Sequence, residues 1–525
     1  MRREDLIAPQ IYNIAEEVEK YAQGPRKVAL IWEDKEGKHR EVTYQELMKN
    51  ANRTGNVFLK SGLKKGDIIL VMVPRIVEAY EVYLAALKCG IVILPSSEML
   101  RTKDLDYRVQ AGDVKGVVSH YSCAGQFKNV RGIEALKKFV IGKPEPGWTF
   151  LDEAKETASD QLETAKTSKD DMAFLSYTSG TTGNPKGVVH SHGWGYSHLR
   201  TAAPNWLGIR EDDRVWATAA PGWQKWVWSP FLSVLGSGAA GFVYNGRFDP
   251  EKYLSLLDEY KINVLCCTPT EYRLMAKVDD LSHYHLEHLR SAVSAGEPLN
   301  REVIEVFKKH FGIKIRDGYG QTENTLLIGI SIDMDLRPGS MGKPFPGNQV
   351  EIINEDGEPC KPGEVGDIAV HKDTPALFKY YYKEPERTAQ QYRGDYYITG
   401  DRARKDEDGY YWFEGRRDDI IISSGYTIGP FEVEDALVKH PYVKECAVVA
   451  SPHEIRGNIV KAFVVLKEGI SEDMPGLVKE LQNHVKQLTA PYKYPRAIEF
   501  IKELPKTASG KIRRVELRRQ ELDRM

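Results

Sequence analysis

The sequence predicts an α/β protein with a β-rich subdomain, in which a large N-terminal domain of layered sheets and helices precedes a small α+β C-terminal domain. Three observations lead to this fold class. Short β-branched runs alternate with amphipathic helical patterns over the first part of the chain, as in buried parallel sheets. From about residue 341, strand-like runs are separated by turn sequences. The last hundred or so residues have the length and pattern of a separate domain.

In the first part, we expect strands at residues 68–73, 91–94, 116–119, 239–244 and 264–267. The longest apolar stretch, residues 77–95, is interrupted by Glu78, Glu81 and Lys88. These charges are incompatible with a membrane span, so the stretch predicts a buried helix that runs into a strand.

In the second part, the sequences of residues 354–357 and 406–409 combine acidic residues with glycine and predict β-hairpin turns. Beyond Arg416 the chain has helix, strand, strand and helix signals. We therefore predict an N-terminal domain of residues 1–417 and a C-terminal domain of residues 418–525, with a hinge at Asp418.

Composition and charge exclude several classes of protein. The 525 residues carry 73 basic and 75 acidic side chains, and the net charge of −2 favours neither nucleic acid nor an anionic membrane. The first ten residues lack the apolar region of a signal peptide. Six cysteines are scattered without CxxC spacing, which predicts reduced, packed thiols and a cytoplasmic protein.

A phosphate-binding loop is the strongest local signal, and it follows a strand-like run at residues 173–177. Glycines let backbone N–H groups turn toward an anion, hydroxyls add donors, and a lysine adds a positive charge. The spacing G-x-x-G-x-x-K departs from the P-loop of kinases, G-x-x-x-x-G-K-[ST]. The predicted ligands are Thr178, Ser179, Gly180, Thr181, Thr182, Gly183, Asn184, Pro185 and Lys186.

This loop, residues 178–187, resembles the signature loop of the adenylate-forming enzymes, which are acyl-CoA synthetases, nonribosomal-peptide adenylation domains and luciferases. Four further segments match that superfamily in the same order, and together they span the chain from about residue 30 to its end. The resemblance implies ATP as a substrate and a mobile C-terminal domain.

Two segments, residues 294–298 and 317–323, are similar to the superfamily's adenine and α-phosphate segments. Tyr319 offers a stacking face, Thr322 can donate to the α-phosphate, and Glu323 supplies the carboxylate oxygen that Mg²⁺ prefers. The resemblance implies nucleotide contacts by Gly296, Glu297, Pro298, Asp317, Gly318, Tyr319, Gly320, Gln321 and Thr322.

The ribose and catalytic-lysine segments complete the match. Asp401 and Arg416 resemble the pair that binds the ribose hydroxyls, whereas the neighbouring Arg417 is expected to be solvated. Lys511 matches the lysine that enters the site during adenylation, where its ammonium stabilises charge at the α-phosphate. The nearby arginines are expected to form a solvated helix face, and the alternative is that they meet coenzyme A phosphates: Arg513, Arg514, Arg518 and Arg519.

Coenzyme A contacts are implied by similarity to medium-chain acyl-CoA synthetases over residues 424–434 and 489–496. Ser424, Gly425 and Tyr426 resemble the loop that lines the pantetheine tunnel, and Arg456 and Lys486 would approach coenzyme A. One departure is Thr427, where that branch usually has an arginine.

Three of the nine tryptophans lie within six residues, where the superfamily builds its acyl pocket. We predict Trp223, Lys225 and Trp228 as pocket residues together with Gly320, because large rings would shorten the accepted chain. For Trp226, core packing and a pocket role are equally good interpretations.

The expected function is an AMP- and pyrophosphate-forming acyl-CoA synthetase that acts on a short- to medium-chain fatty acid, with branched acids included. Lys511, Thr322, Glu323 and Gly425 would be its catalytic residues, with ATP, Mg²⁺ and coenzyme A. The alternatives are an adenylation enzyme that loads a carrier protein, a luciferase-type oxygenase and an inactive nucleotide-binding homologue. Neither a nucleic acid partner nor a membrane span is expected, and the oligomeric state is not predicted.

Overall fold

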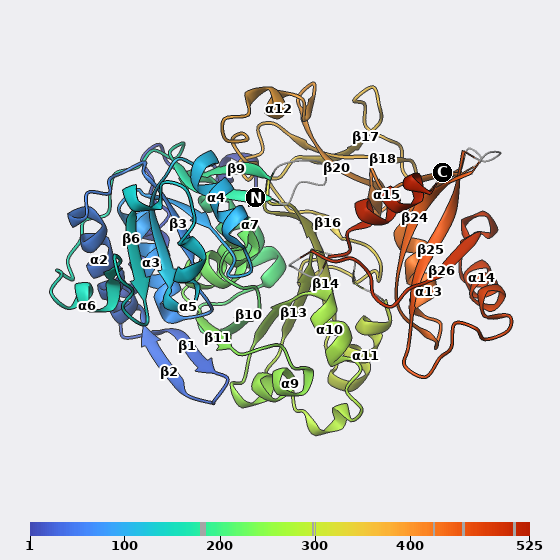
Figure 1. Ribbon diagram of the computed structural model, residues 1–525, viewed down its shortest axis with the longest axis horizontal. Helices are drawn as coiled ribbons and strands as arrows, with labels where there is room; N and C mark the ends of the chain where they lie inside the picture. Colours follow the sequence, from blue (N-terminus) through green and yellow to red (C-terminus); the bar gives the residue numbers. More distant parts are fainter. Residues whose placement is uncertain are drawn as a thin grey trace. The chain divides into compact units, whose positions relative to one another are not determined.

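The computed structural model describes residues 1–178, 185–296, 299, 301–423, 426–453, 457–507 and 511–524, and only the backbone of residues 426, 427, 457 and 491. The chain forms two compact units (Figure 1). The first consists of Met1–Gln349 and His371–Tyr392, and the second of Val350–Val370 and Arg393–Met525. The domain boundary at residue 418 stays a prediction.

The first unit contains a seven-stranded sheet in the order β7-β6-β5-β3-β4-β8-β9 (Figure 1). All neighbouring strands are parallel except β8 and β9, which are antiparallel. The strands are β3 (Ile68–Met72), β4 (Val92–Pro95), β5 (Val114–His120), β6 (Lys137–Ile141), β7 (Thr149–Phe150), β8 (Met172–Thr178) and β9 (Lys186–Ser191).

A nine-stranded sheet in the same unit has the order β16-β15-β14-β13-β12-β10-β11-β1-β2. Its six central strands are parallel, and antiparallel strands close both edges. The strands are β1 (Val28–Asp34), β2 (His39–Thr43), β10 (Arg214–Ala217), β11 (Ala240–Asn245), β12 (Val264–Cys267), β13 (Ser291–Ala295), β14 (Ile315–Gly320), β15 (Leu326–Gly329) and β16 (Lys343–Pro344).

Helices cover these sheets, and short polar sequences start several of them. Before α2, the Thr43 hydroxyl accepts from Glu46 N while the Glu46 carboxylate accepts from Thr43 N, which is a capping box. The helices are α1 (Glu16–Ala22), α2 (Tyr44–Lys60), α3 (Val77–Lys88), α4 (Thr102–Ala111), α5 (Tyr121–Ala124), α6 (Leu151–Glu156), α7 (His192–Ala202), α8 (Gln224–Trp226), α9 (Pro250–Glu259), α10 (Pro269–Met275), α11 (Arg301–Phe311) and α12 (Pro385–Ala389). Two π-helices are η4 (Ala203–Leu207) and η5 (Val227–Ser233), and the 3-10 helices are η1 (Arg3–Leu6), η2 (Gly125–Phe127), η3 (Ile133–Ala135) and η6 (Leu281–His283).

The core of the first unit is layered. Along β3, Ile69 and Val71 pack with α2 and α3, while Leu70 and Met72 pack with α4 on the opposite face. The cluster that contains α2, α3 and α7 also includes residues of both sheets, and α9, α10 and α11 cover the outer face of the nine-stranded sheet. The strands are thus buried on both faces, which explains their continuous apolar sequences.

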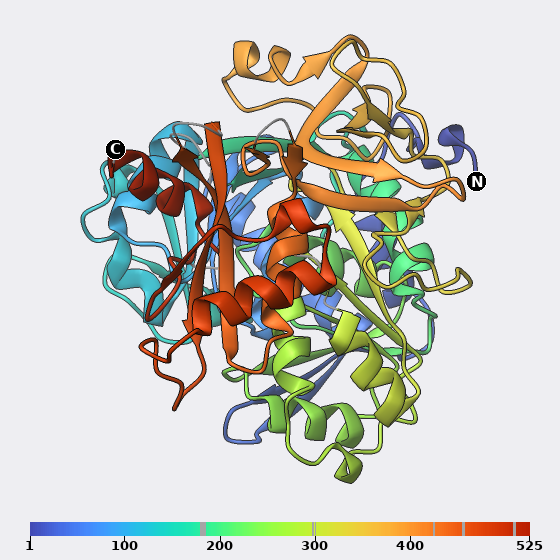
Figure 2. The ribbon, with the colours of Figure 1, turned by 90° about the vertical axis from the view of Figure 1, so that its right-hand side faces the viewer.

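The second unit contains a five-stranded sheet in the order β17-β18-β20-β19, with β21 paired to β20, and a three-stranded sheet β24-β25-β26; the pairs β17–β18 and β20–β21 are antiparallel. Helices α13 and α14 pack on one face of the latter sheet and α15 on the other (Figure 2). The strands are β17 (Val350–Ile353), β18 (Val365–His371), β19 (Tyr392–Arg393), β20 (Tyr396–Lys405), β21 (Tyr411–Arg416), β22 (Ile421–Ser423), β23 (Tyr426–Ile428), β24 (Val443–His453), β25 (Gly457–Leu466) and β26 (Ala497–Phe500). The helices are α13 (Pro430–Val438), α14 (Leu477–Leu488), η7 (Pro491–Lys493) and α15 (Arg514–Asp523).

The structure confirms the predicted fold class. The five expected strands are present as β3, β4, β5, β11 and β12, and residues 77–95 form α3 followed by β4. Residues 406–409 turn between β20 and β21, where Lys405 pairs with Tyr411, and residues 354–357 turn between Ile353 and its bridge partner Pro359. All six cysteines are buried free thiols. Among the residues that the structure describes, the helices are too short or too polar to cross a bilayer.

Candidate active site

The predicted phosphate loop lies between two antiparallel strands. β8 ends at Thr178, β9 begins at Lys186, and these two residues are register partners. The Pro185 carbonyl oxygen accepts a hydrogen bond from the Tyr107 hydroxyl at 3.1 Å. The ladder therefore holds the two ends of the loop together. Six predicted ligands lie outside the described residues: Ser179, Gly180, Thr181, Thr182, Gly183 and Asn184.

A segment far along the chain lies beside the strand that leaves this loop. Tyr381 forms an antiparallel bridge with Val188 of β9, and Tyr382 N donates to Gly187 O at 2.7 Å. The Tyr381 ring faces the loop's lysine, because the Lys186 Nζ is 4.9 Å from the ring centroid. The ammonium group and the aromatic ring thus form a cation–π contact.

The residues predicted to bind adenine lie on and after β14. The Asp317 carboxylate is buried and accepts from Gly318 N at 2.8 Å, and burial raises the pKa of this carboxyl to about 7. A Cβ at Gly318 would lie 2.6 Å from Trp206 Nε1, and one at Gly320 would lie 2.2 Å from Thr325 O. These approaches allow only glycine at both positions. Tyr319 and Gln321 are half-buried.

The main chain that carries Thr322 and Glu323 is held by hydrogen bonds to three successive carbonyl oxygens. His190 Nε2 lies 2.5 Å from Thr322 O, Phe378 N donates to Glu323 O at 2.7 Å, and Trp194 Nε1 donates to Asn324 O at 3.0 Å. Burial lowers the pKa of His190 to about 3, so the ring is neutral and its N–H can donate. These donors come from β9, α7 and the segment before α12, which places residues 322–324 beside the strand that begins at Lys186.

One of the two carboxylate oxygens of Glu323 accepts a hydrogen bond. Its Oε1 accepts from the Tyr381 hydroxyl at 2.9 Å, and Oε2 has no hydrogen-bond or ion-pair partner within the described ranges. Glu323 is half-buried, with one carboxylate oxygen held by a hydrogen bond and the other without such a partner in the described part of the chain. A carboxylate of this kind is suited to bind a hard cation such as Mg²⁺.

The end of β13 leads into the other predicted adenine segment. Gly296 follows this strand with φ +108°, a conformation that favours glycine. Lys225 Nζ donates to the carbonyl oxygen of Ala295 at 2.8 Å, so this lysine contacts the end of β13. Glu297 and Pro298 lie outside the described residues.

The tryptophan cluster divides into two environments. Trp226 is 1% exposed and stacks on Phe231 with ring centroids 5.5 Å apart, between Tyr80 and Tyr83, which assigns it to core packing. Trp228 is also buried, and its carbonyl oxygen accepts from His198 Nε2 at 2.8 Å. Trp223 is half-buried. A pocket role for Trp223, Lys225, Trp228 and Gly320 stays a prediction.

In the second unit, the predicted ribose-binding pair is formed by cross-strand neighbours. Asp401 of β20 and Arg416 of β21 are register partners, with Arg416 Nε 3.8 Å from Asp401 Oδ1. The Asp401 side chain is 9% exposed and that of Arg416 is 44% exposed. The carboxylate is therefore buried, whereas the arginine side chain is largely exposed.

The expectation of solvated arginines is wrong for Arg514 and Arg518, whereas Arg417, with a side chain that is 46% exposed, lies in solvent as expected although it also pairs with carboxylates. Arg417 contacts Glu355 at 3.1 Å and the buried Asp367 at 3.3 Å. On α15, Arg514 donates to both carboxylate oxygens of the buried Glu434, and Arg518 pairs with Asp419. Buried carboxylates require such partners. Arg519 has a side chain that is 84% exposed, as expected.

Two hydrogen bonds join Lys511 to Thr507. Thr507 N donates to Lys511 O at 2.7 Å, and Lys511 N donates to the Thr507 hydroxyl at 3.1 Å. Lys506 bridges with Ile512 in the main chain, and its Nζ pairs with Glu445 of β24 at 2.6 Å. Lys506 is thereby attached to the three-stranded sheet of the second unit.

The predicted coenzyme A residues are only partly described. Tyr426 begins β23 opposite Ser423, and Lys486 of α14 has its Nζ 4.0 Å from the Tyr494 ring centroid. Asp418, the predicted hinge, is exposed in the turn after β21. Three predicted residues lie outside the described part of the chain: Ser424, Gly425 and Arg456.

Sequence reasoning missed the side chains that support Thr322 and Glu323, namely His190, Trp194, Phe378 and Tyr381. His190 and Trp194 directly follow the phosphate loop, which is the available signal for the first two. The run of aromatic residues at 378–382 has no periodicity that reveals which ring points inward.

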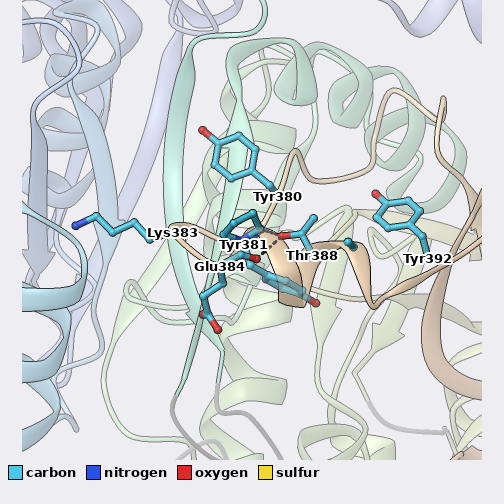
Figure 3. Close-up of a pocket in the computed structure, with 8 residues that line it drawn as sticks. Tyr380, Tyr381, Lys383, Glu384, Thr388 and Tyr392 are labelled. Atoms are coloured by element: carbon cyan, nitrogen blue, oxygen red, sulfur yellow. Dashed lines mark hydrogen bonds between the residues drawn. The ribbon is translucent and has the colours of Figure 1, made fainter.

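A cavity of about 500 Å³ lies beside this aromatic run, and its lining residues all belong to the first unit (Figure 3). Tyr381 N donates to the Thr388 hydroxyl at 2.9 Å, and that hydroxyl donates to Glu384 O at 2.9 Å. Helix α12 thus holds the main chain of Tyr381 through Thr388, on the side of the cavity. The lining residues are Tyr380, Tyr381, Lys383, Glu384, Pro385, Thr388, Ala389 and Tyr392.

Comparisons with known proteins agree with these motifs. Residues 18–382 match the family described as AMP-binding enzyme, and residues 432–511 match the AMP-binding enzyme C-terminal domain. An uncharacterized acyl-CoA ligase of Bacillus subtilis (strain 168), YtcI, is 66% identical over 99% of this chain and 98% of its own length. The mitochondrial acyl-coenzyme A synthetase ACSM3 of Rattus norvegicus is 42% identical over 98% of this chain and 91% of its own.

Solved structures show the same fold. The anthranilate CoA ligase AuaEII, in complex with anthranoyl-AMP, has a TM-score of 0.91 at 30% identity, covering 100% of this chain and 99% of that one. A benzoate CoA ligase from Burkholderia xenovorans LB400 has a TM-score of 0.85 at 30% identity, covering 97% of this chain and 100% of that one.

Proposed function

Because this chain belongs to the AMP-binding enzyme family, we propose that it is an acyl-CoA synthetase that joins a carboxylic acid to coenzyme A and converts ATP to AMP and pyrophosphate. The names of its relatives, acyl-CoA ligase and acyl-coenzyme A synthetase, support coenzyme A as the acceptor in place of a carrier protein. One observation carries the proposal: Tyr381 contacts both Lys186 and Glu323. Two motifs far apart in the sequence thus meet where a polyphosphate would bind.

In the first half-reaction, a carboxylate oxygen of the acid forms a bond to the α-phosphorus of ATP, and the bond to pyrophosphate breaks. Lys186 and the loop that it ends hold the polyphosphate, and Thr322 donates to an α-phosphate oxygen. Lys511 stabilises the charge that moves onto the α-phosphate. The restrained main chain at Thr322 keeps its hydroxyl in place, which lowers the cost of ordering the reactants.

Glu323 is the residue that would hold Mg²⁺, through the Oε2 atom, which has no hydrogen-bond or ion-pair partner among the described residues. When bound, the ion offsets negative charge on the phosphates. Asp317 and Gly318 border the adenine, and Asp401 with Arg416 would bind the ribose hydroxyls.

In the second half-reaction, the sulfur of coenzyme A forms a bond to the acyl carbonyl carbon, the bond to AMP breaks, and the thiol proton is released. We assign coenzyme A contacts to Ser424, Gly425, Tyr426, Arg456 and Lys486. A rotation about Asp418 would remove Lys511 and present Gly425, so that one site performs both reactions.

The proposed acid is a short- to medium-chain fatty acid, with branched acids included. Buried aromatic bulk at Trp228 supports a short pocket. The two solved relatives are named for anthranilate and benzoate, so aromatic acids are the competing class.

The test is ATP–pyrophosphate exchange with acetate, propionate, isobutyrate, 2-methylbutyrate, hexanoate, octanoate and benzoate. We expect exchange that depends on an aliphatic acid, and AMP release that also requires coenzyme A. A preference for benzoate contradicts the aliphatic assignment, and exchange without any thioester product contradicts the synthetase.

A further inference from the structure

We propose that Tyr381 is a positioning residue that orients the metal-binding carboxylate of Glu323 and seats the phosphate-binding ammonium of Lys186. This inference rests on the proposed function, because it concerns how the chain holds Mg²⁺ and ATP. Tyr381 is 1% exposed and belongs to none of the motifs found in the sequence.

The hydroxyl of Tyr381 determines how Glu323 can bind a cation. It donates to Oε1 at 2.9 Å, and Phe378 N holds the Glu323 carbonyl oxygen at 2.7 Å. With both the main chain and one carboxylate oxygen restrained, Oε2 is the oxygen available for a metal ion. Partners of this kind orient a ligating carboxylate.

A phenol suits this position because it is a neutral donor at physiological pH. A lysine or arginine there would form an ion pair with Glu323 and compete with the cation for its charge. The tyrosine restrains the carboxylate and leaves its negative charge for Mg²⁺.

The aromatic ring of Tyr381 contacts Lys186 of the phosphate-binding motif. The Lys186 Nζ lies 4.9 Å from its centroid, and Phe378 packs against the ring at 4.8 Å. The aromatic face attracts the ammonium without neutralising it, so Lys186 keeps its charge for phosphate. The Tyr381 side chain therefore positions two groups: the Lys186 ammonium that binds phosphate and the Glu323 carboxylate that binds Mg²⁺.

Two hydrogen-bond systems keep Tyr381 in place. The main chain on either side pairs with β9, where Lys379 N donates to Val189 O at 2.9 Å and Tyr382 N donates to Gly187 O at 2.7 Å. The Thr388 hydroxyl accepts from Tyr381 N at 2.9 Å (Figure 3). Placement by a strand and a helix gives the precision that a metal site needs.

The experiment measures binding of ATP by calorimetry without acid or coenzyme A, at increasing Mg²⁺ and in EDTA. Tyr381→Phe removes the hydroxyl and keeps the ring, whereas Tyr381→Leu removes both. The matched control is Tyr382→Phe, which removes a hydroxyl–carboxylate hydrogen bond of 3.0 Å to Asp113.

We expect Tyr381→Phe to raise the half-saturating Mg²⁺ concentration by about 10–100-fold and to leave ATP binding in EDTA unchanged. Tyr381→Leu should weaken ATP binding in EDTA as well, because Lys186 loses the ring. Tyr382→Phe should behave as wild type. In a Glu323→Gln background, Tyr381→Phe should add no further Mg²⁺ dependence.

The inference is overturned if Tyr381→Phe matches Tyr382→Phe, if it weakens ATP binding equally with and without Mg²⁺, or if its effect adds to that of Glu323→Gln. Should Tyr381→Phe not fold, Thr388→Val tests the same contacts from the helix side, and an unchanged Mg²⁺ requirement overturns the inference. Wild-type protein that binds no ATP at any Mg²⁺ concentration overturns the proposed function itself, and this inference with it.

Discussion

His190 holds Thr322 from inside the core: its Nε2 lies 2.5 Å from the Thr322 carbonyl oxygen, and the ring is fully buried. Burial lowers the pKa of His190 to about 3. This residue, three positions after the phosphate loop, thus restrains the predicted α-phosphate donor while it stays uncharged.

Three buried histidines should make the protein sensitive to acid. Burial lowers the pKa of His192 and of His198 to about 4, as it does that of His190 to about 3. An unfolded histidine binds a proton below about pH 6.5, so stability is complete above that pH and is lost as the pH falls toward 4. Each histidine should reduce the free energy of unfolding by about 2 kcal/mol between pH 7 and pH 5.

Urea denaturation at the two pH values measures this loss. His192→Gln should reduce the loss by about 2 kcal/mol, whereas replacement of the exposed His310 with glutamine should leave it unchanged. An equal loss in all three proteins would contradict the prediction.

The affinity for ATP should change with pH near neutrality, because the Asp317 carboxyl loses its proton there. This carboxyl is buried and its pKa is raised to about 7, so it is protonated in acid and gains charge as the pH rises through 7. A raised folded pKa means that its contribution to stability is present below about pH 4 and is lost as the pH rises through 7.

Asp317→Asn should therefore abolish the inflection near pH 7 in ATP affinity and increase the free energy of unfolding at pH 8. The exposed Asp333 provides the control, since Asp333→Asn should preserve both properties of the wild type. Persistence of the inflection in Asp317→Asn would assign it to another group.

Lys511 and Gly425 should separate the two half-reactions. Lys511→Ala should slow ATP–pyrophosphate exchange by about 10²–10³-fold and spare thioester formation from added acyl-adenylate, because its ammonium acts at the α-phosphate. Gly425→Leu should do the opposite by blocking the path of the pantetheine arm. Lys502→Ala, at an exposed position in the same unit, is the control. Equal damage to both half-reactions by both variants would rule out domain alternation.

Substitution of Trp226 should change stability, whereas substitution of Trp228 should change the preference among acids. Trp226 packs in the core, so Trp226→Ala should cost about 3–5 kcal/mol of stability without changing the order of preferred acids. Trp228→Ala should raise the kcat/KM for octanoate relative to isobutyrate by about 10-fold, because it lengthens the pocket. Thermal denaturation and the acid series together measure both effects. An unchanged preference in Trp228→Ala removes Trp228 from the pocket.

Local sequence was sufficient for most elements and for the order of the motifs. The apolar runs at 68–73 and 264–267 became buried strands because their period and length match strands buried on both faces. The same local signals were insufficient for individual polar side chains: Arg514 and Arg518 were expected in solvent, and each is partly buried and pairs with a carboxylate.

The sequence by itself determined the chemistry of this protein: a loop suited to polyphosphate, a carboxylate suited to Mg²⁺ and a lysine near the C-terminus, all in the order of one enzyme family. Only the tertiary structure decided which side chains support that chemistry. Tyr381 reaches Lys186 and Glu323 because residues 378–382 pair with β9 and Glu323 follows β14. These contacts depend on the pairing of strands from distant segments. Residue type and local periodicity do not encode that pairing.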